Sequence, residues 1–148
     1  MEWIRLKAGL ALLTAGVLLS STFGCAGDLP PPADQVLDVH VKDFKIEPTL
    51  PTTASGRVEL RVRNAGPATH EFVVVRSDLP ADQLPIAADG LSVDEDQVVP
   101  VGELDEVEAG STETLTLPLT PGRYVLFCNL EGHYLIGMSA SIEVIDDV

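Results

Sequence analysis

The chain has 148 residues and a formal net charge of −14 at pH 7, because 23 Asp and Glu outnumber 9 Lys and Arg. This length corresponds to one domain with a modest core rather than to two domains. The strong acidic balance excludes nucleic acid as a natural partner, since the phosphate backbone requires a basic surface.

Residues 1–24 have the pattern of a secretory signal peptide. Arg5 and Lys7 form a short basic region, and the run 8–21 is nearly all apolar. That run is too short to be a comfortable membrane span. The signal ends at Gly24-Cys25, and a small residue before a Cys resembles a bacterial lipoprotein signal, in which the Cys becomes lipidated and starts the mature chain. The alternatives are cleavage after Gly27, which gives a free soluble protein, and an uncleaved anchor.

We therefore expect an exported protein that is lipid-anchored through Cys25 to the extracytoplasmic face of a bacterial membrane, or is periplasmic. The segment 25–35 contains Pro30-Pro31-Pro32 and lacks apolar periodicity. It is expected to be an extended, semi-stiff tether. The folded domain is expected to be 36–148.

The domain reads as short strands with alternating apolar residues. The first alternation runs over 37–41, and its apolar phase then shifts to Phe44 and Ile46, which predicts a bulge near Lys42-Asp43. Further strands are expected over 57–63, 71–75, 114–119, 123–128 and 138–145, with Gly and Pro between them. No long helical period occurs, and only parts of 79–88 could form a short helix. The pattern predicts an all-β sandwich.

One stretch of the domain is strongly acidic. No Lys or Arg lies between Arg76 and Arg123. The acidic residues of this interval are Asp78, Asp82, Asp89, Asp94, Glu95, Asp96, Glu103, Asp105, Glu106, Glu108 and Glu113. Two interpretations stay open: a solvated loop that favours solubility, or a surface that steers a basic redox partner.

The candidate chemistry lies in a Cys-x4-His-x4-Met run formed by Cys128, His133 and Met138, with His70 upstream. Two imidazoles, a thiolate and a weakly bound thioether are the ligands of a blue-copper site. In the strand period, His70, Cys128 and Met138 each share a phase with apolar neighbours, so they are expected to face the interior. The third histidine, His40, shares a face with Asp38 and Lys42 and is expected to face solvent.

These segments resemble the cupredoxin family of small blue-copper proteins. The resemblance is strongest in Pro121–Met138 and in Asn64–Phe72, and the Cys-x4-His-x4-Met spacing is most similar to the auracyanin and rusticyanin branches. It implies a Greek-key β-sandwich and one mononuclear type 1 copper. By this resemblance His70, Cys128 and His133 are equatorial ligands and Met138 is axial. Backbone N–H groups after His70 and after Cys128 are implied to donate to the sulfur.

The resemblance implies a one-electron carrier and not an enzyme. Copper oxidases and reductases need further copper sites with extra His, and a binuclear centre needs a second Cys near Cys128; neither is present in this sequence. The alternative is a copper storage or delivery module. We expect a monomer whose partners are redox proteins, and steering by the acidic stretch would favour basic ones. The apolar residues 134–136 have two open interpretations: plain packing within the loop, or, as the resemblance implies, a docking patch around the edge of His133.

Overall fold

The computed structural model describes residues 33–146. The signal segment, Cys25 and most of the expected tether lie outside this range. Within it, no helix is both long and apolar enough to span a membrane. The strands are β1 (Gln35–Lys42), β2 (Lys45–Pro48), β3 (Thr52–Ala54), β4 (Gly56–Asn64), β5 (His70–Arg76), β6 (Val99–Val107), β7 (Thr112–Leu119), β8 (Gly122–Phe127) and β9 (Ser139–Ile145).

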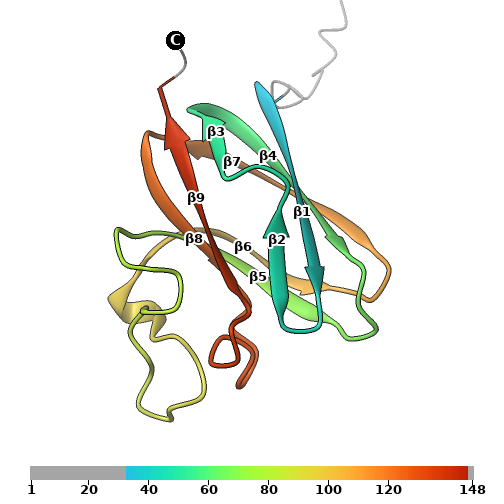
Figure 1. Ribbon diagram of the computed structural model, residues 1–148, viewed down its shortest axis with the longest axis vertical. Coiled ribbons are helices and arrows are strands. Elements are labelled where there is room, and N and C mark those ends of the chain that lie inside the picture. Colours follow the sequence, from blue (N-terminus) through green and yellow to red (C-terminus); the bar gives the residue numbers. More distant parts are fainter. Residues whose placement is uncertain (1–32, 147–148) are drawn as a thin grey trace, which may run out of the picture. The chain divides into compact units, whose positions relative to one another are not determined.

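These strands form two sheets, one with the order β2-β1-β4-β7 and one with the order β3-β9-β8-β5-β6 (Figure 1). β1 pairs in parallel with β4, and β3 in parallel with β9, while the other pairs are antiparallel. Alternate residues of β1 and β4 are buried between the sheets, because successive side chains of a strand point to opposite faces. The predicted all-β sandwich is confirmed.

The predicted bulge near Lys42-Asp43 is wrong, because the chain reverses there. β1 and β2 form an antiparallel hairpin in which Lys42 pairs with Lys45, so Asp43 and Phe44 are its two turn residues. Val41 and Ile46 lie directly opposite each other and are both buried. Cross-strand partners share one face of a sheet, which explains the apolar phase shift that the bulge was invoked to explain.

No helix forms over 79–88, the one segment that could have formed a short one. Pro80 and Pro85 interrupt this segment, and Ile86 instead makes an isolated bridge with Val93. The short helix of the acidic interval is a 3₁₀ turn at Glu95–Gln97. Proline lacks the N–H that a helix interior needs, so residues 77–98, the first part of the acidic interval, form an irregular loop between β5 and β6.

This loop, residues 77–98, covers the outer face of the five-stranded sheet. Leu84 and Val93 from the loop are buried. They belong to a second apolar cluster with Val73, Val75, Val125, Phe127 and Tyr134. The sandwich therefore has two cores, one between the sheets and one between β5–β8 and the 77–98 loop.

The expected metal ligands gather at one end of the sandwich. His70 is the first residue of β5, Cys128 follows the last residue of β8, and Met138 precedes the first residue of β9. Figure 1 shows the loop 128–138 and the β1–β2 turn at this same end, away from the end where the C-terminus lies. The five-stranded sheet therefore supplies these three ligand positions, and the β1–β2 turn of the other sheet lies beside them.

Candidate metal centre

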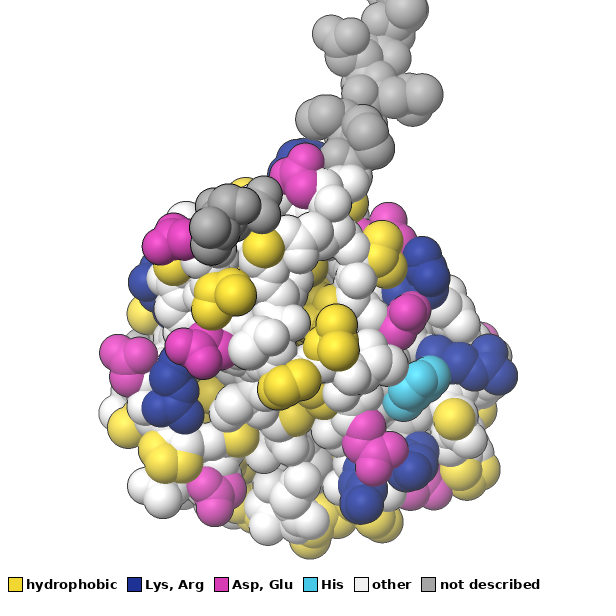
Figure 2. All heavy atoms as spheres, turned by 45° about the horizontal axis from the view of Figure 1, so that its top comes forward, with side chains coloured by type: hydrophobic (Ala, Val, Ile, Leu, Met, Phe, Trp, Pro, Cys, Tyr) yellow, Lys and Arg dark blue, Asp and Glu magenta, His cyan; other side chains and the backbone are white. Residues whose placement is uncertain are grey.

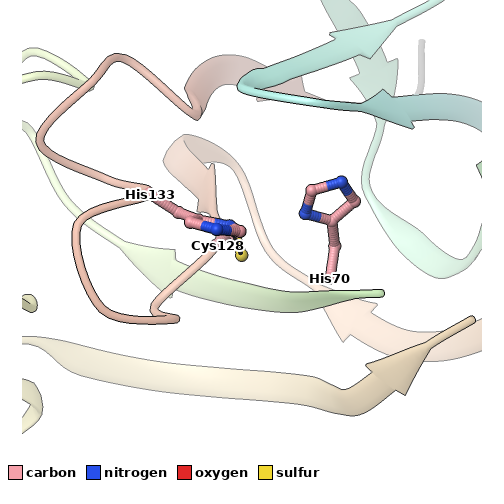
Figure 3. Close-up of side chains that lie close together, drawn as sticks. All are labelled: His70, Cys128 and His133. Carbon is pink, nitrogen blue, oxygen red and sulfur yellow. Dashed lines mark hydrogen bonds between the residues drawn. The ribbon is translucent and has the colours of Figure 1, made fainter. Parts of the chain in front are cut away.

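Three side chains of the site converge as the sequence predicted (Figure 3). One donor atom from each of His70, Cys128 and His133 lies within 4.8 Å of the other two, and Cys128 Sγ is 3.3 Å from His133 Nδ1. One ion with bonds of about 2.0–2.3 Å to N and S can bridge such donors after small side-chain adjustment. Within residues 33–146 this is the one cluster of its kind.

His70 has one ring nitrogen, Nδ1, that is free to bind a metal. Its side chain is 1% exposed, and Nδ1 has no hydrogen-bond partner. The other ring nitrogen, Nε2, lies 3.3 Å from Asp43 Oδ1. A carboxylate accepts, so Nε2 carries the proton and Nδ1 presents its lone pair. Figure 3 shows one ring nitrogen of His70 facing Cys128 and His133. Burial lowers the pKa of His70, with a smaller opposing effect from Asp43, which favours the neutral ring that binds metal.

Cys128 is a free thiol with no exposed surface. Burial raises its pKa, while hydrogen bonds from the backbone of Leu130 and Glu71 act in the opposite direction. The metal-free sulfur therefore keeps its proton, and metal binding would release it. Glu71, which directly follows His70, is the backbone donor to the sulfur that the resemblance implied at that position. The other backbone donor, Leu130, lies two residues after Cys128.

Met138 completes the donor set. It is fully buried and packs in the same core cluster as Cys128. The Cys128 N–H donates to the Met138 carbonyl at 3.1 Å, and the Met138 N–H donates to the His133 carbonyl at 3.1 Å. These bonds close the loop on itself. The cluster of two His, one Cys and one Met matches the donor set of a type 1 copper site.

Two glycines permit this closure. Gly132 has φ of 81° and Gly137 has φ of 95°, values that residues with a Cβ rarely adopt. The sequence pointed to these positions because each glycine directly precedes a ligand.

The 77–98 loop braces the ligand loop from the outside. The Asn129 amide oxygen accepts from the Val93 N–H at 2.7 Å. The Tyr134 hydroxyl accepts from the Leu84 N–H at 2.8 Å and donates to the Ala81 carbonyl at 2.8 Å. The interpretation that places Tyr134 in a surface patch is therefore wrong, because its ring is buried in the second core. Within that core the Tyr134 hydroxyl makes both hydrogen bonds to the backbone of the 77–98 loop.

Asn64 organises the approach to His70. It is fully buried. Its amide nitrogen donates to the carbonyls of Ala68 at 2.7 Å and Val107 at 2.8 Å, and its oxygen accepts from the Gly66 N–H at 2.9 Å. An Asn side chain that hydrogen-bonds the backbone two residues further on, as Asn64 does with Gly66, is the usual signature of an Asx turn. The Asn-Ala-Gly-Pro sequence contained this signal, although we did not assign Asn64 a role from sequence.

The outward edge of the site is apolar. His133 is partly exposed, and its ring meets the ring of Phe44 edge to face, with centroids 5.5 Å apart. Leu135 and Ile136 are exposed on the same loop. The expected patch therefore consists of Phe44, Leu135 and Ile136. Phe44 was missed because the bulge interpretation placed it in a strand and not in the turn.

Glu71 is a half-buried acid that directly follows His70 in β5. Successive side chains of a strand point to opposite faces, so Glu71 lies on the other face of the sheet from His70. Burial raises the pKa of Glu71 to about 7, and nearby carboxylates add to this effect. Those carboxylates belong to Glu95, Glu103 and Asp105.

His40, the third histidine, is exposed as expected.

Comparison with known proteins identifies the fold. No family model matches the chain, and no curated protein matches it. Among solved structures it is similar to the reduced auracyanin of Roseiflexus castenholzii, with a TM-score of 0.57, 21% identity and coverage of 76% of this chain and 98% of that one. It is similar to auracyanin A, a "blue" copper protein of Chloroflexus aurantiacus, with a TM-score of 0.53, 20% identity and coverage of 74% and 97%. It is also similar to rusticyanin of Thiobacillus ferrooxidans, with a TM-score of 0.52, 18% identity and coverage of 78% and 84%.

An enzyme also shares this fold over part of its length. A multicopper oxidase of Campylobacter jejuni matches with a TM-score of 0.54 and 11% identity, and the match covers 80% of this chain but 31% of the oxidase. At these identities the likeness shows the fold alone. The domain has the cupredoxin fold.

Proposed function

We propose that this cupredoxin-fold protein is an extracytoplasmic one-electron carrier with one mononuclear type 1 copper, held by His70, Cys128, His133 and Met138. The observation that carries the proposal is the bare Nδ1 of His70. This atom is buried and has no hydrogen-bond partner. One ring nitrogen of His70 lies within 4.8 Å of the Cys128 and His133 donors, and Figure 3 shows a ring nitrogen facing them. A buried polar atom without a partner is costly, and a metal bond would remove that cost.

The protein's own contribution to electron transfer would be to hold the donors still. Copper bound by these donors supplies a one-electron couple, because thiolate and thioether suit Cu(I) and imidazole suits both states. Cys128 and Met138 are joined by a backbone hydrogen bond, and His70 is fixed through Asp43. A donor set that is already positioned limits rearrangement between oxidation states.

A copper titration followed by visible spectroscopy tests the proposal. We expect one Cu(II) per chain and an intense blue or green colour from charge transfer between the thiolate and copper. The same spectrum separates the carrier from a storage or delivery module, which would favour Cu(I) and an open, exchangeable site. Full copper occupancy without strong visible absorption would contradict the carrier proposal.

The proposed axial role of Met138 predicts a change in reduction potential. In Met138→Gln a harder oxygen would stabilise Cu(II) relative to Cu(I), so copper should stay bound at a lower potential. Each tenfold gain in the ratio of Cu(II) to Cu(I) affinity lowers the potential by about 59 mV. Voltammetry measures this shift. Met138→Leu serves as the control, because it removes the thioether without adding oxygen and should raise the potential. Equal potentials in all three proteins would show that Met138 is not a ligand.

The charge distribution supports a basic redox partner. On the face drawn in Figure 2, basic and acidic side chains lie interspersed. The segment 77–122 has no Lys or Arg, and its 77–98 part is hydrogen-bonded to the ligand loop. We take the partly exposed edge of His133 as the route by which the electron leaves. Acidic charge therefore lies beside this exit route, where it would attract a basic partner over about one Debye length.

The proposed localisation rests on the signal pattern and Cys25, which lie outside the described residues. We expect Cys25→Ser to release the protein from the membrane fraction or to block its maturation, because serine offers no thiol for lipidation. Fractionation and mass spectrometry of the N-terminus measure this, with Cys128→Ser as the control that leaves the signal unchanged. An unmodified N-terminus and identical fractionation of the wild type and Cys25→Ser would refute lipid anchoring.

A further inference from the structure

The contact between Asp43 and His70 has no counterpart in the Cys-x4-His-x4-Met motif, and it joins residues 27 positions apart in the chain. We propose that Asp43 is a positioning residue of the metal centre, which locks the tautomer of His70 through Nε2 and lowers the reduction potential of the bound copper. This inference rests on the proposed function for its redox part, while its tautomer part concerns the metal-free protein.

Two separate observations on the His70 ring support the proposal. Nε2 lies 3.3 Å from a carboxylate oxygen of Asp43, and Nδ1 has no partner. A neutral imidazole has one N–H and one lone pair, so the acceptor at Nε2 decides which nitrogen binds metal. Metal-ligating histidines commonly donate their other N–H to a carboxylate or carbonyl, which fixes the ring and raises its basicity.

The structure holds Asp43 in place from two sides. Asp43 and Phe44 form the two-residue turn between β1 and β2. The loop before His70 packs directly on this turn, since a Cβ built on Gly66 would lie 2.8 Å from Asp43 Oδ1. The Ala65 N–H also donates to the Val41 carbonyl at 2.8 Å. Glycine at position 66 therefore permits the close approach that brings Asp43 to His70.

The same turn reaches the other imidazole. Phe44 has φ of 64°, a left-handed conformation that costs energy for a bulky side chain. At this angle its ring packs edge to face against His133, at a centroid distance of 5.5 Å. One turn of the N-terminal hairpin thus contacts both histidines of the site, although neither histidine belongs to that hairpin.

The negative charge of Asp43 is expected to lower the reduction potential of the bound copper. Cu(II) carries one more positive charge than Cu(I), so a carboxylate next to a ligand stabilises Cu(II) more. The Asp43 side chain is 38% exposed, which allows it to stay solvated while it accepts from a buried ring. Its removal is expected to raise the potential.

Three variants separate the parts of the proposal. Asp43→Asn keeps an acceptor oxygen and removes the charge. Asp43→Ala removes both. Glu47→Gln removes one charge from the same hairpin, where Glu47 pairs with Lys42 and Lys45 and does not contact His70. Nitrogen-15 NMR of the metal-free proteins reports the His70 tautomer, and copper competition titrations and voltammetry report affinity and potential.

We expect the wild type, Asp43→Asn and Glu47→Gln to hold His70 with the proton on Nε2, and Asp43→Ala to show a mixture of tautomers. Asp43→Ala should bind Cu(II) about 10–100-fold more weakly. A tenfold loss confined to Cu(II) raises the potential by about 59 mV. Asp43→Asn should raise the potential with a smaller loss of affinity, and Glu47→Gln should change neither.

The outcomes distinguish this inference from the proposed function. A wild type that binds no copper overturns the carrier, yet the NMR comparison still decides the tautomer role. A single, unchanged His70 tautomer in Asp43→Ala overturns that role. A coloured wild type whose potential is matched by Asp43→Asn and Asp43→Ala overturns the redox role. Thermal unfolding of Asp43→Ala identifies any loss of fold, in which case Asp43→Asn decides the redox role.

Discussion

Cys128→Ser is expected to abolish the visible colour of the Cu(II) protein and to weaken copper binding by at least 100-fold. The colour arises from charge transfer between the thiolate and copper, and a serine hydroxyl stays protonated and hard where copper favours soft sulfur. Cys128 is buried among apolar side chains, so a hydroxyl there also destabilises the metal-free fold, by about 1–3 kcal/mol. Visible spectroscopy after copper addition and thermal unfolding measure the two effects.

His40→Gln is the matched control for this experiment, because His40 is the exposed histidine. It should keep full colour and wild-type copper affinity. Retention of the colour in Cys128→Ser, or its loss in His40→Gln, would show that the proposed site is not the chromophore.

Leu135→Asp is expected to slow electron transfer to a protein partner by tenfold or more at every salt concentration. The Leu135 side chain is 48% exposed on the ligand loop, near the partly exposed edge of His133. A carboxylate at a contact that excludes water loses hydration without gaining a partner, which costs several kcal/mol, and each 1.4 kcal/mol is a factor of ten. Stopped-flow transfer to a basic c-type cytochrome, used as a probe, measures the rate.

The control is Leu50→Asp, which places the same charge on another exposed leucine. Leu50 is 57% exposed and lies between β2 and β3, beyond the end of β2 that is remote from the β1–β2 turn. It should transfer electrons like the wild type. Raising the salt should slow association in all three proteins, because the Debye length falls from about 10 Å at 0.1 M to about 3 Å at 1 M.

A different set of electron-transfer rates in these variants would show that the electron leaves elsewhere than at His133. If Leu135→Asp has no effect, while neutralising Asp94, Glu95 and Asp96 abolishes transfer within the complex, electrons leave through the 77–98 loop. We propose instead that this loop attracts the partner at long range and braces the ligand loop.

The sandwich could be predicted from sequence where local alternation decides burial. In β4 the apolar residues Val58, Leu60 and Val62 alternate with charged ones and are all buried. β6 was missed because its residues are mostly exposed or half-buried, so no clear alternation marks it. The β1–β2 hairpin was misread because a two-residue turn and a bulge produce the same apolar phase shift, and only pairing of Val41 with Ile46 separates them.

The sequence by itself determined the donor set of the site. The residue types and the even spacing of Cys128, His133 and Met138 are chemical facts of the chain, and a single loop delivers all three. The bare nitrogen of His70 depends on Asp43, the outward patch depends on Phe44, and the ligand loop is braced by contacts of Tyr134 and Asn129 with the 77–98 loop. Only the tertiary structure decided these contacts, because they join segments 27 to 89 positions apart, and residue spacing carries no information about packing between separate strands and loops.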